Sequence, residues 1–243
     1  MSYSRSTVQI ESIGGMSQSP RPMRANSRPI RSRQAGPHPR LGEIVARHLD
    51  ADYRRCPGES GRHAFARVAD RLAAGSFVLD AGCGTGASTF VLARRHPSRL
   101  VLGVDKSAVR LEIGQQEIDA GTAPGNAILL RCELVDFWQL AAAAGLRCER
   151  QYLLYPNPWP KPDQLMRRWH AHPVLPSLLA LGGTIELRTN WRVYAEEFAE
   201  ALQLARRLAR PEEFLVDDPL TPFERKYAAS GHALWRCVAD VGG

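Results

Sequence analysis

The segment Phe77–Ala87, which reads FVLDAGCGTGA, decides the fold of this chain. A short apolar run leads straight into an acid and three alternating glycines, and a segment with helical spacing, Ser88–Arg95, follows it. Glycine lets the backbone turn sharply at the carboxyl end of a strand and lets a ligand approach the chain closely. The segment therefore predicts a buried strand, a ligand-binding turn and a helix in succession.

Apolar runs of strand length alternate with helical segments from Leu41 onward. The strand-like runs are Phe77–Leu79, Leu100–Val104, Ile128–Leu130, Tyr152–Tyr155 and Thr184–Leu187. The helical segments are Leu41–Leu49, His63–Leu72, Ser88–Arg95, Ala108–Asp119, Phe137–Ala144, Met166–Leu181 and Tyr194–Arg207. This alternation predicts a Rossmann-like α/β fold, in which helices cover both faces of a mostly parallel sheet. Two more strand-like pieces, Glu213–Val216 and Leu234–Ala239, would close its edge and complete seven strands.

Charge divides the chain near residue 40. The net charge is +7 over 243 residues, and residues 1–40 hold seven arginines and one acid, which is +6 of that total. This stretch is also rich in proline and serine and lacks apolar periodicity, so we expect it to be disordered when free. The predicted organisation is a basic arm, residues 1–40, followed by one domain, residues 41–243. An arm that orders on RNA and a solvated extension both fit this composition.

Composition excludes several other classes of protein. No run of 18 uncharged apolar residues could cross a membrane, and the first residues lack the apolar core of a secretion signal. The five cysteines stand singly without C-x-x-C spacing, so neither a metal site nor a disulfide framework is expected. We expect a cytoplasmic protein, and a monomer in preference to an oligomer.

The glycine-rich segment fits two kinds of nucleoside cofactor. Gly82, Gly84 and Ala87 match the G-x-G-x-x-A fingerprint of dinucleotide sites. Asp80, Gly82, Gly84 and Gly86 match the D-x-G-x-G-x-G loop of enzymes that use S-adenosylmethionine. The second match is favoured, because a carboxylate at Asp80 can meet the ammonium of a methionyl group. The chain also lacks the separate substrate domain that a dehydrogenase requires.

Two more acids stand at the ends of predicted strands. Asp105 follows the second strand, about twenty residues after the glycines, where a carboxylate can accept both hydroxyls of a ribose. It could instead cap the helix that begins near Ser107. Glu133 follows the third strand, where it could accept a hydrogen bond from an adenine amino group.

The loop after the fourth strand indicates a planar base as substrate. Tyr155–Lys161 reads YPNPWPK, and its three prolines stiffen the chain at the edge where active sites lie in such sheets. Here Trp159 could stack on a base while the Asn157 amide hydrogen-bonds its edge. Arg167 and Arg168 follow beside a tryptophan and are suited to phosphate contact, although a solvated helix face would carry such residues too.

Five motifs occur in order along the chain: Arg31–Gln34, Asp80–Gly86, Pro156–Lys161 with Arg167 and Arg168, Thr189–Glu196, and Thr221–Glu224 with Gly231 and His232. With this series the chain, from about Arg28 to Val238, resembles the bacterial tRNA (guanine-N7)-methyltransferases. The resemblance implies a class I S-adenosylmethionine-dependent methyltransferase fold and tRNA, or another structured RNA, as partner.

The same resemblance implies roles for individual residues. It places Asp80, Asp105 and the loop at Asn157 on the cofactor, and Lys161, Asn190 and the turn Thr221–Glu224 on the target nucleotide. Trp159, Arg167, Arg168, Thr221 and Glu224 are therefore candidate substrate-binding residues, alongside Lys161 and Asn190.

The chain departs from the motifs of that family at three acids. Asparagines, Asn157 and Asn190, replace two aspartates of the substrate motifs, and Glu133 lies one residue before the expected acid, where Leu134 stands. Guanine N7 offers an unprotonated lone pair, so its attack needs alignment more than a general base. Each loss of a charged hydrogen bond costs on the order of 1 kcal/mol. We therefore expect Asn157 and Asn190, the candidate catalytic residues, to slow the reaction or retune base choice without abolishing it.

Three functions fit the sequence. The first is methylation of guanine N7 in tRNA. The second is a methyltransferase with the same cofactor site and another base or a small molecule as substrate, which the two asparagines favour. The third is a relative that binds cofactor or RNA without catalysis.

Overall fold

A seven-stranded mixed sheet forms the centre of the molecule, in a computed structural model that describes residues 27–51, 53 and 55–242. Its strands are β1 (Phe77–Ala81), β2 (Val101–Asp105), β3 (Ala127–Arg131), β4 (Cys148–Leu154), β5 (Thr184–Thr189), β6 (Pro211–Glu213) and β7 (Trp235–Asp240). Their order is β3-β2-β1-β4-β5-β7-β6, with β1 to β5 parallel and β7 antiparallel to both of its neighbours. The predicted mostly parallel sheet of seven strands is confirmed.

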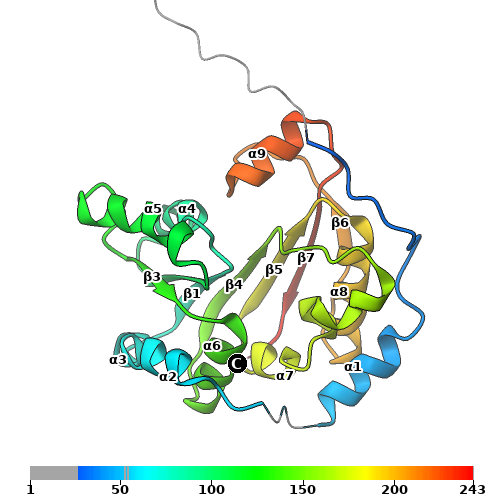
Figure 1. Ribbon diagram of the computed structural model, residues 1–243, viewed down its shortest axis with the longest axis horizontal. Coiled ribbons are helices and arrows are strands. Elements are labelled where there is room, and N and C mark those ends of the chain that lie inside the picture. Colours follow the sequence, from blue (N-terminus) through cyan, green and yellow to red (C-terminus); the bar gives the residue numbers. More distant parts are fainter. Residues whose placement is uncertain (1–26, 52, 54, 243) are drawn as a thin grey trace, which may run out of the picture.

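Helices cover both faces of this sheet (Figure 1). They are α1 (Leu41–Leu49), α2 (Glu59–Ala66), α3 (Ala69–Ala73), α4 (Ala87–Arg95), α5 (Ala108–Asp119), α6 (Leu134–Ala143), α7 (Leu175–Ala180), α8 (Arg192–Leu204) and α9 (Pro222–Ala229). Successive residues of a strand point to opposite faces, so Leu79 joins the larger core under α1, α6, α7 and α8, while Val78 joins a smaller one under α4. In the described part of the chain, no helix is long and apolar enough to span a membrane.

The helix predicted over Met166–Leu181 is wrong in its first half. Two short 3-10 turns, η1 (Pro162–Arg167) and η2 (Trp169–Ala171), precede α7. Pro173 and Pro176 lack the N–H that a continuous helix would use, and His172 is extended because it precedes a proline. The resulting irregular backbone directly follows the loop Tyr155–Lys161 and bonds it through Arg168.

The last part of the predicted arm, residues 27–40, is docked on the domain. Residues 27–40 lie against the domain and run from the end of α9 to the start of α1 (Figure 1). In this extended segment Arg31 and Arg33 are exposed, whereas Ser32 and Gln34 are half-buried and hydrogen-bond the domain. Residues 1–26, and the disorder predicted for them, lie outside the described residues.

Close packing of α4 on β2 leads to a test. A methyl group at Gly103 would overlap the hydroxyl of Thr89 and lie 3.0 Å from Cys83 Sγ. Since Thr89 cannot retreat without losing its 2.8 Å hydrogen bond to Asp80, Gly103→Ala should lower the free energy of unfolding by about 1–3 kcal/mol. Gly75→Ala is the control, because nothing lies within 4 Å of its Cβ position. Urea unfolding measures both, and equal stabilities would show that α4 shifts freely.

Candidate functional site

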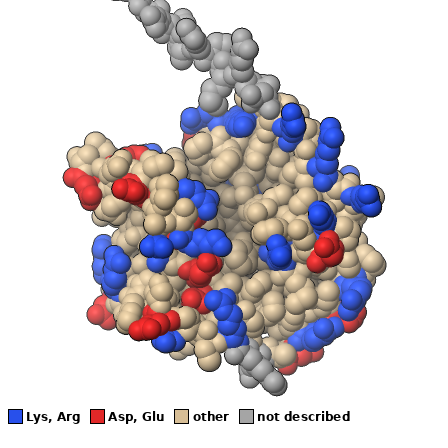
Figure 2. All heavy atoms as spheres, viewed as in Figure 1, with Lys and Arg blue, Asp and Glu red and all other residues tan. Residues whose placement is uncertain are grey.

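The carboxyl ends of the parallel strands lie together at one edge of the sheet, beneath a hollow of the surface. Lysine and arginine side chains gather along the rim of this hollow (Figure 2). Since ligands of open α/β sheets bind outside the carboxyl ends of their strands, this edge is the candidate active site. Most of the residues predicted from sequence lie at the carboxyl ends of β1 to β5 or in the segments that follow them, whereas Thr221 and Glu224 lie at the start of α9, after β6.

The glycine loop after β1 turns through three left-handed residues. Gly82, Gly84 and Gly86 have φ values of 85°, 59° and 84°, which residues with a Cβ rarely adopt. The N–H groups of Gly82 and Cys83 donate to the carbonyl of Val104, which ties the loop to β2. Nothing lies within 4 Å of the position of a Cβ on Gly84. The loop therefore offers a backbone surface that a ligand can approach closely.

Asp80 is a buried carboxylate, and only one of its two oxygens accepts hydrogen bonds from the described residues. Its Oδ2 accepts hydrogen bonds from Ser88 Oγ at 2.6 Å and Thr89 Oγ1 at 2.8 Å. No described residue donates to Oδ1. Burial raises the pKa of Asp80 to about 6, although the two hydroxyl groups oppose the shift. Such a group ionises readily when a cation arrives beside it.

Asp105 braces the glycine loop at the end of β2. Its Oδ2 accepts from the N–H of Gly84 at 3.0 Å, and its Oδ1 from the N–H of Ser107 at 2.8 Å. The cap of α5 is Ser107, whose hydroxyl accepts from the N–H of Arg110, so Asp105 is not the cap itself. Glu133 is exposed at the end of β3 and lies 3.6 Å from Lys106. The structure thus brings the predicted cofactor acids to adjacent strand ends.

The loop after β4 is strained at both of its ends. Tyr155 and Trp159 have φ values of 51° and 46°, in the left-handed region that bulky residues avoid. The Tyr155 hydroxyl donates to Glu224 at 3.0 Å, and the carbonyl of Trp159 accepts two hydrogen bonds from Arg168. Asn157 lies between these two fixed points and is exposed. Its amide is therefore held by the loop rather than by side-chain contacts.

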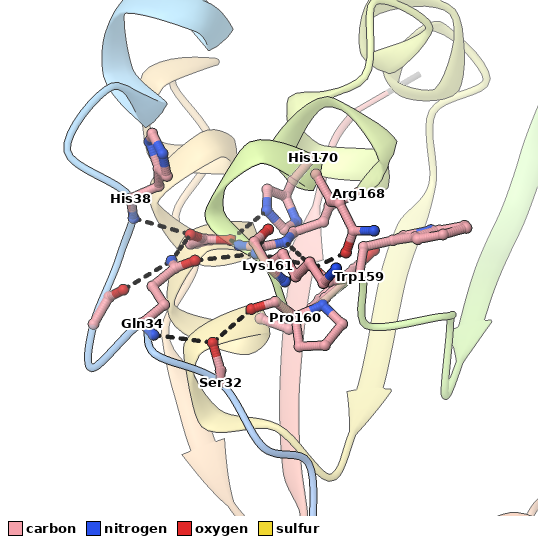
Figure 3. Close-up of polar contacts among 12 residues, drawn as sticks. Ser32, Gln34, His38, Trp159, Pro160, Lys161, Arg168 and His170 are labelled. Atoms are coloured by element: carbon pink, nitrogen blue, oxygen red, sulfur yellow. Dashed lines mark hydrogen bonds and ion pairs between the residues drawn. The ribbon is translucent and has the colours of Figure 1, made fainter.

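Arg168 holds this loop from beneath, which overturns its predicted contact with phosphate. The side chain is 0% exposed, and its guanidinium donates to Glu197 at 2.5 Å and to Gln34 at 3.0 Å (Figure 3). The same group donates to the carbonyls of Trp159 and Lys161. A phosphate in solvent cannot reach it. Such a contact remains available to its exposed neighbours.

Those neighbours are Arg167 and Lys161. Both are exposed, and the Arg167 guanidinium lies 4.7 Å from the centre of the Trp159 ring. A cation stacked on tryptophan in this way keeps its charge at the surface of the loop.

The turn Thr221–Glu224 is a helix cap, and Glu224 is not free to meet a nucleotide. The hydroxyl of Thr221 accepts from the N–H of Glu224 at 2.9 Å at the start of α9. Glu224 is 0% exposed and accepts from Arg188 and Tyr155, each at 3.0 Å. Its predicted substrate contact is therefore wrong. It fixes one end of the strained loop instead.

Asn190 follows β5 directly and is half-exposed. Its amide nitrogen lies 3.2 Å from Nδ1 of His232, on the loop between α9 and β7. Because β4 and β5 are parallel neighbours, with Leu154 opposite Arg188, the segments that carry Asn157 and Asn190 start from adjacent strand ends. The two candidate catalytic amides share the same edge as the glycine loop.

Two buried residues were missed by the sequence analysis, Glu197 and His170. Glu197 accepts from Arg168 and from Nε2 of His170, and its other oxygen from Gln34 at 2.5 Å and the N–H of His38 at 2.9 Å. Burial would raise the pKa of Glu197, but His170 and Arg168 outweigh it and lower that pKa to about 2. The available signal was an acid on the apolar side of α8.

Comparisons with known proteins show the family of the chain. A family described as "Putative methyltransferase" matches residues 74–237. The chain is 30% identical over 190 residues to a tRNA (guanine-N(7)-)-methyltransferase of Thiobacillus denitrificans, which covers 72% of this chain and 76% of that protein. It is 29% identical over 183 residues to the protein of that name from Leifsonia xyli subsp. xyli, with 70% and 76% covered.

Solved structures show the same fold. The 16S rRNA methyltransferase KamB is 18% identical, with a TM-score of 0.53 over 79% of this chain and 100% of that one. A variant of the 16S rRNA (adenine(1408)-N(1))-methyltransferase from Catenulisporales acidiphilia is 18% identical, with a TM-score of 0.52 over 73% and 91%. The predicted class I S-adenosylmethionine-dependent methyltransferase fold is confirmed.

The burial of Arg168 predicts a large effect of its removal. Arg168→Met would leave the Glu197 carboxylate buried without its strongest partner, so the free energy of unfolding should fall by about 3–5 kcal/mol. Arg167→Met is the matched control, and loss of its exposed stacking should cost less than about 1 kcal/mol. Urea unfolding of the two variants provides the comparison. Equal losses would contradict the role of Arg168 as the support of the loop.

Proposed function

Since this chain belongs to the family of S-adenosylmethionine-dependent methyltransferases whose model matches residues 74–237, we propose that it methylates guanine N7 in tRNA. One observation carries the proposal. Asn157 and Asn190 leave neighbouring parallel strands at the edge where the glycine loop opens. The names of the relatives from Thiobacillus denitrificans and Leifsonia xyli supply the substrate.

The glycine loop and the acids around it fit S-adenosylmethionine. Asp80 Oδ1 would accept from the ammonium, and the open side of Gly84 would admit the cofactor to the backbone. Asp105 Oδ2 accepts one hydrogen bond, while Oδ1 accepts one and lies 3.4 Å from the exposed guanidinium of Arg110, and the remaining lone pairs would suit the ribose hydroxyls. Glu133 would accept from the adenine amino group. When bound, this cofactor supplies a methyl group on a positively charged sulfur.

The substrate side of the site works by alignment. Guanine N7 has an in-plane lone pair, so no residue has to remove a proton before attack. Trp159, backed by Arg167, would stack on the base, and the amides of Asn157 and Asn190 would hold its edge. The prolines and the buried Arg168 keep these groups in place, which is the contribution that such a reaction requires of the protein.

Exposed cations around the site suit an RNA partner. Lys161 ends the loop after β4, Arg167 ends η1, and Arg31 and Arg33 point outward from the docked arm. Arginine and lysine that contact phosphates supply most of the sequence-independent affinity for nucleic acid. The enzyme would thereby act in tRNA modification.

A second substrate has one specific argument. An asparagine amide donates a hydrogen bond that a carboxylate cannot, so Asn157 and Asn190 could read another base. Replacing both asparagines by aspartate should raise methylation of guanine but lower methylation of another base, which distinguishes the two substrates.

Restoring both acids tests the proposed reaction. For guanine, Asn157→Asp with Asn190→Asp should raise N7-methylguanosine formation roughly tenfold, because carboxylates stabilise the charge that develops on the base. The measurement uses labelled S-adenosylmethionine and unmodified total tRNA, followed by mass spectrometry of the nucleosides. If another base is the substrate, the same change lowers methylation of that base. A folded, cofactor-binding protein that modifies no nucleoside in the pool would contradict the proposal.

Asp80 predicts how cofactor affinity depends on pH. Its carboxyl group has a pKa of about 6 in the free protein and must be ionised to accept an ammonium. Affinity should therefore be full above pH 6 and fall, by up to about tenfold per unit, as pH drops below 6. Calorimetry between pH 5 and 7 measures this dependence. Asp80→Asn should bind more weakly and lose the dependence, whereas the exposed Asp217→Asn should keep it; a flat profile for the unaltered protein would refute the assignment.

A further inference from the structure

His232 lies between the arm and Asn190. Its Nε2 is 3.1 Å from the carbonyl oxygen of Ser27, and its Nδ1 is 3.2 Å from the amide nitrogen of Asn190. The imidazole stacks on the ring of Tyr227, with centroids 5.3 Å apart and planes 18° apart. His232 has no role in the reaction proposed above.

The partners of the ring fix where its proton resides. A carbonyl oxygen only accepts hydrogen bonds, so Nε2 must carry the hydrogen that Ser27 receives. The neutral ring has one N–H, and Nδ1 therefore presents a lone pair to Asn190. Asn190 must then turn its NH₂ group toward the ring and its carbonyl oxygen, Oδ1, away from it. No described residue donates to that oxygen, and Asn190 is half-exposed.

We propose that His232 is a positioning residue that makes Asn190 an acceptor toward the substrate. The inference rests on the proposed function, because it concerns how the base is read. An unrestrained amide can rotate and serve a donor or an acceptor equally well. With its NH₂ group engaged by His232, Asn190 offers an oxygen to the N1–H and N2–H donors of guanine. Adenine, whose N1 is an acceptor, meets an oxygen there and is rejected.

The arm takes part in this selection. Ser27 supplies the carbonyl that sets the tautomer, and its own N–H donates to Ser230 Oγ at 3.3 Å. A residue of the arm thus controls, through one imidazole, which end of the Asn190 amide faces the substrate.

A double-mutant cycle tests this role. His232→Phe retains a ring for Tyr227 but offers no acceptor, so kcat/KM for guanine methylation should fall about tenfold, the worth of one hydrogen bond, with unchanged affinity for S-adenosylmethionine. In the Asn190→Asp background either oxygen can accept, so the same change at His232 should alter kcat/KM less than twofold. Tyr227→Phe, which keeps the stack, is the control. Equal losses in both backgrounds, or none in either, would overturn the proposal.

Nitrogen NMR of the unaltered protein gives a readout that needs no activity. The ¹⁵N shifts and couplings of His232 should report a proton on Nε2 and a bare Nδ1 at the pH of the assay. A proton on Nδ1, alone or together with Nε2, overturns the assigned orientation of Asn190. The absence of guanine methylation overturns the proposed function instead, and the tautomer of His232 then still decides whether Asn190 is oriented as inferred.

Discussion

The buried guanidinium of Arg168 joins the loop Tyr155–Lys161, the docked arm and α8. Removing such a cation from water is costly, so its donors must all find acceptors inside the protein. They find the carboxylate of Glu197, the amide of Gln34 and the carbonyl of Trp159. These acceptors come from three segments, so the cation keeps all of its partners only while the three segments stay together. Its contribution is therefore less to stability than to a single placement of the loop that bears Asn157.

Buried charge supports the other end of that loop as well. The left-handed conformations of Tyr155 and Trp159 each cost on the order of 1–3 kcal/mol, and they persist because their surroundings leave no alternative. Glu224 holds Tyr155 by accepting a hydrogen bond from its hydroxyl, and Arg168 holds Trp159 by donating to its carbonyl. Both charged residues resembled nucleotide contacts in sequence. In the structure both hydrogen-bond the loop instead, and the exposed amide of Asn157 lies between the two points that they hold.

How much of this could be predicted depends on the range of the interactions involved. The sheet and the glycine loop follow from local patterns, because apolar runs and glycines set strand and turn within a few residues. Burial of Arg168 does not, since its partner Gln34 lies 134 residues away and their pairing exists only in the folded chain. Glu197 is indicated by the sequence pattern, because it is an acid beside Tyr194 and Phe198 on the apolar side of α8. Such an acid indicates a buried cation without identifying it.

The docked part of the arm shows what composition alone does not reveal. Successive side chains of an extended segment point to opposite faces. A segment with arginine at every second position therefore has one basic face and one face formed by the residues between the arginines. From Arg31 to Gln34 the arginines face solvent, while Ser32 donates to the carbonyl of Pro160 and Gln34 joins Arg168. At its beginning, Ser27 reaches His232. The segment is thus bonded to the supports of both asparagines, and it displays its positive charge toward solvent. The outward positive charge follows from the basic composition. The bonding to the domain depends on which residues lie between the arginines.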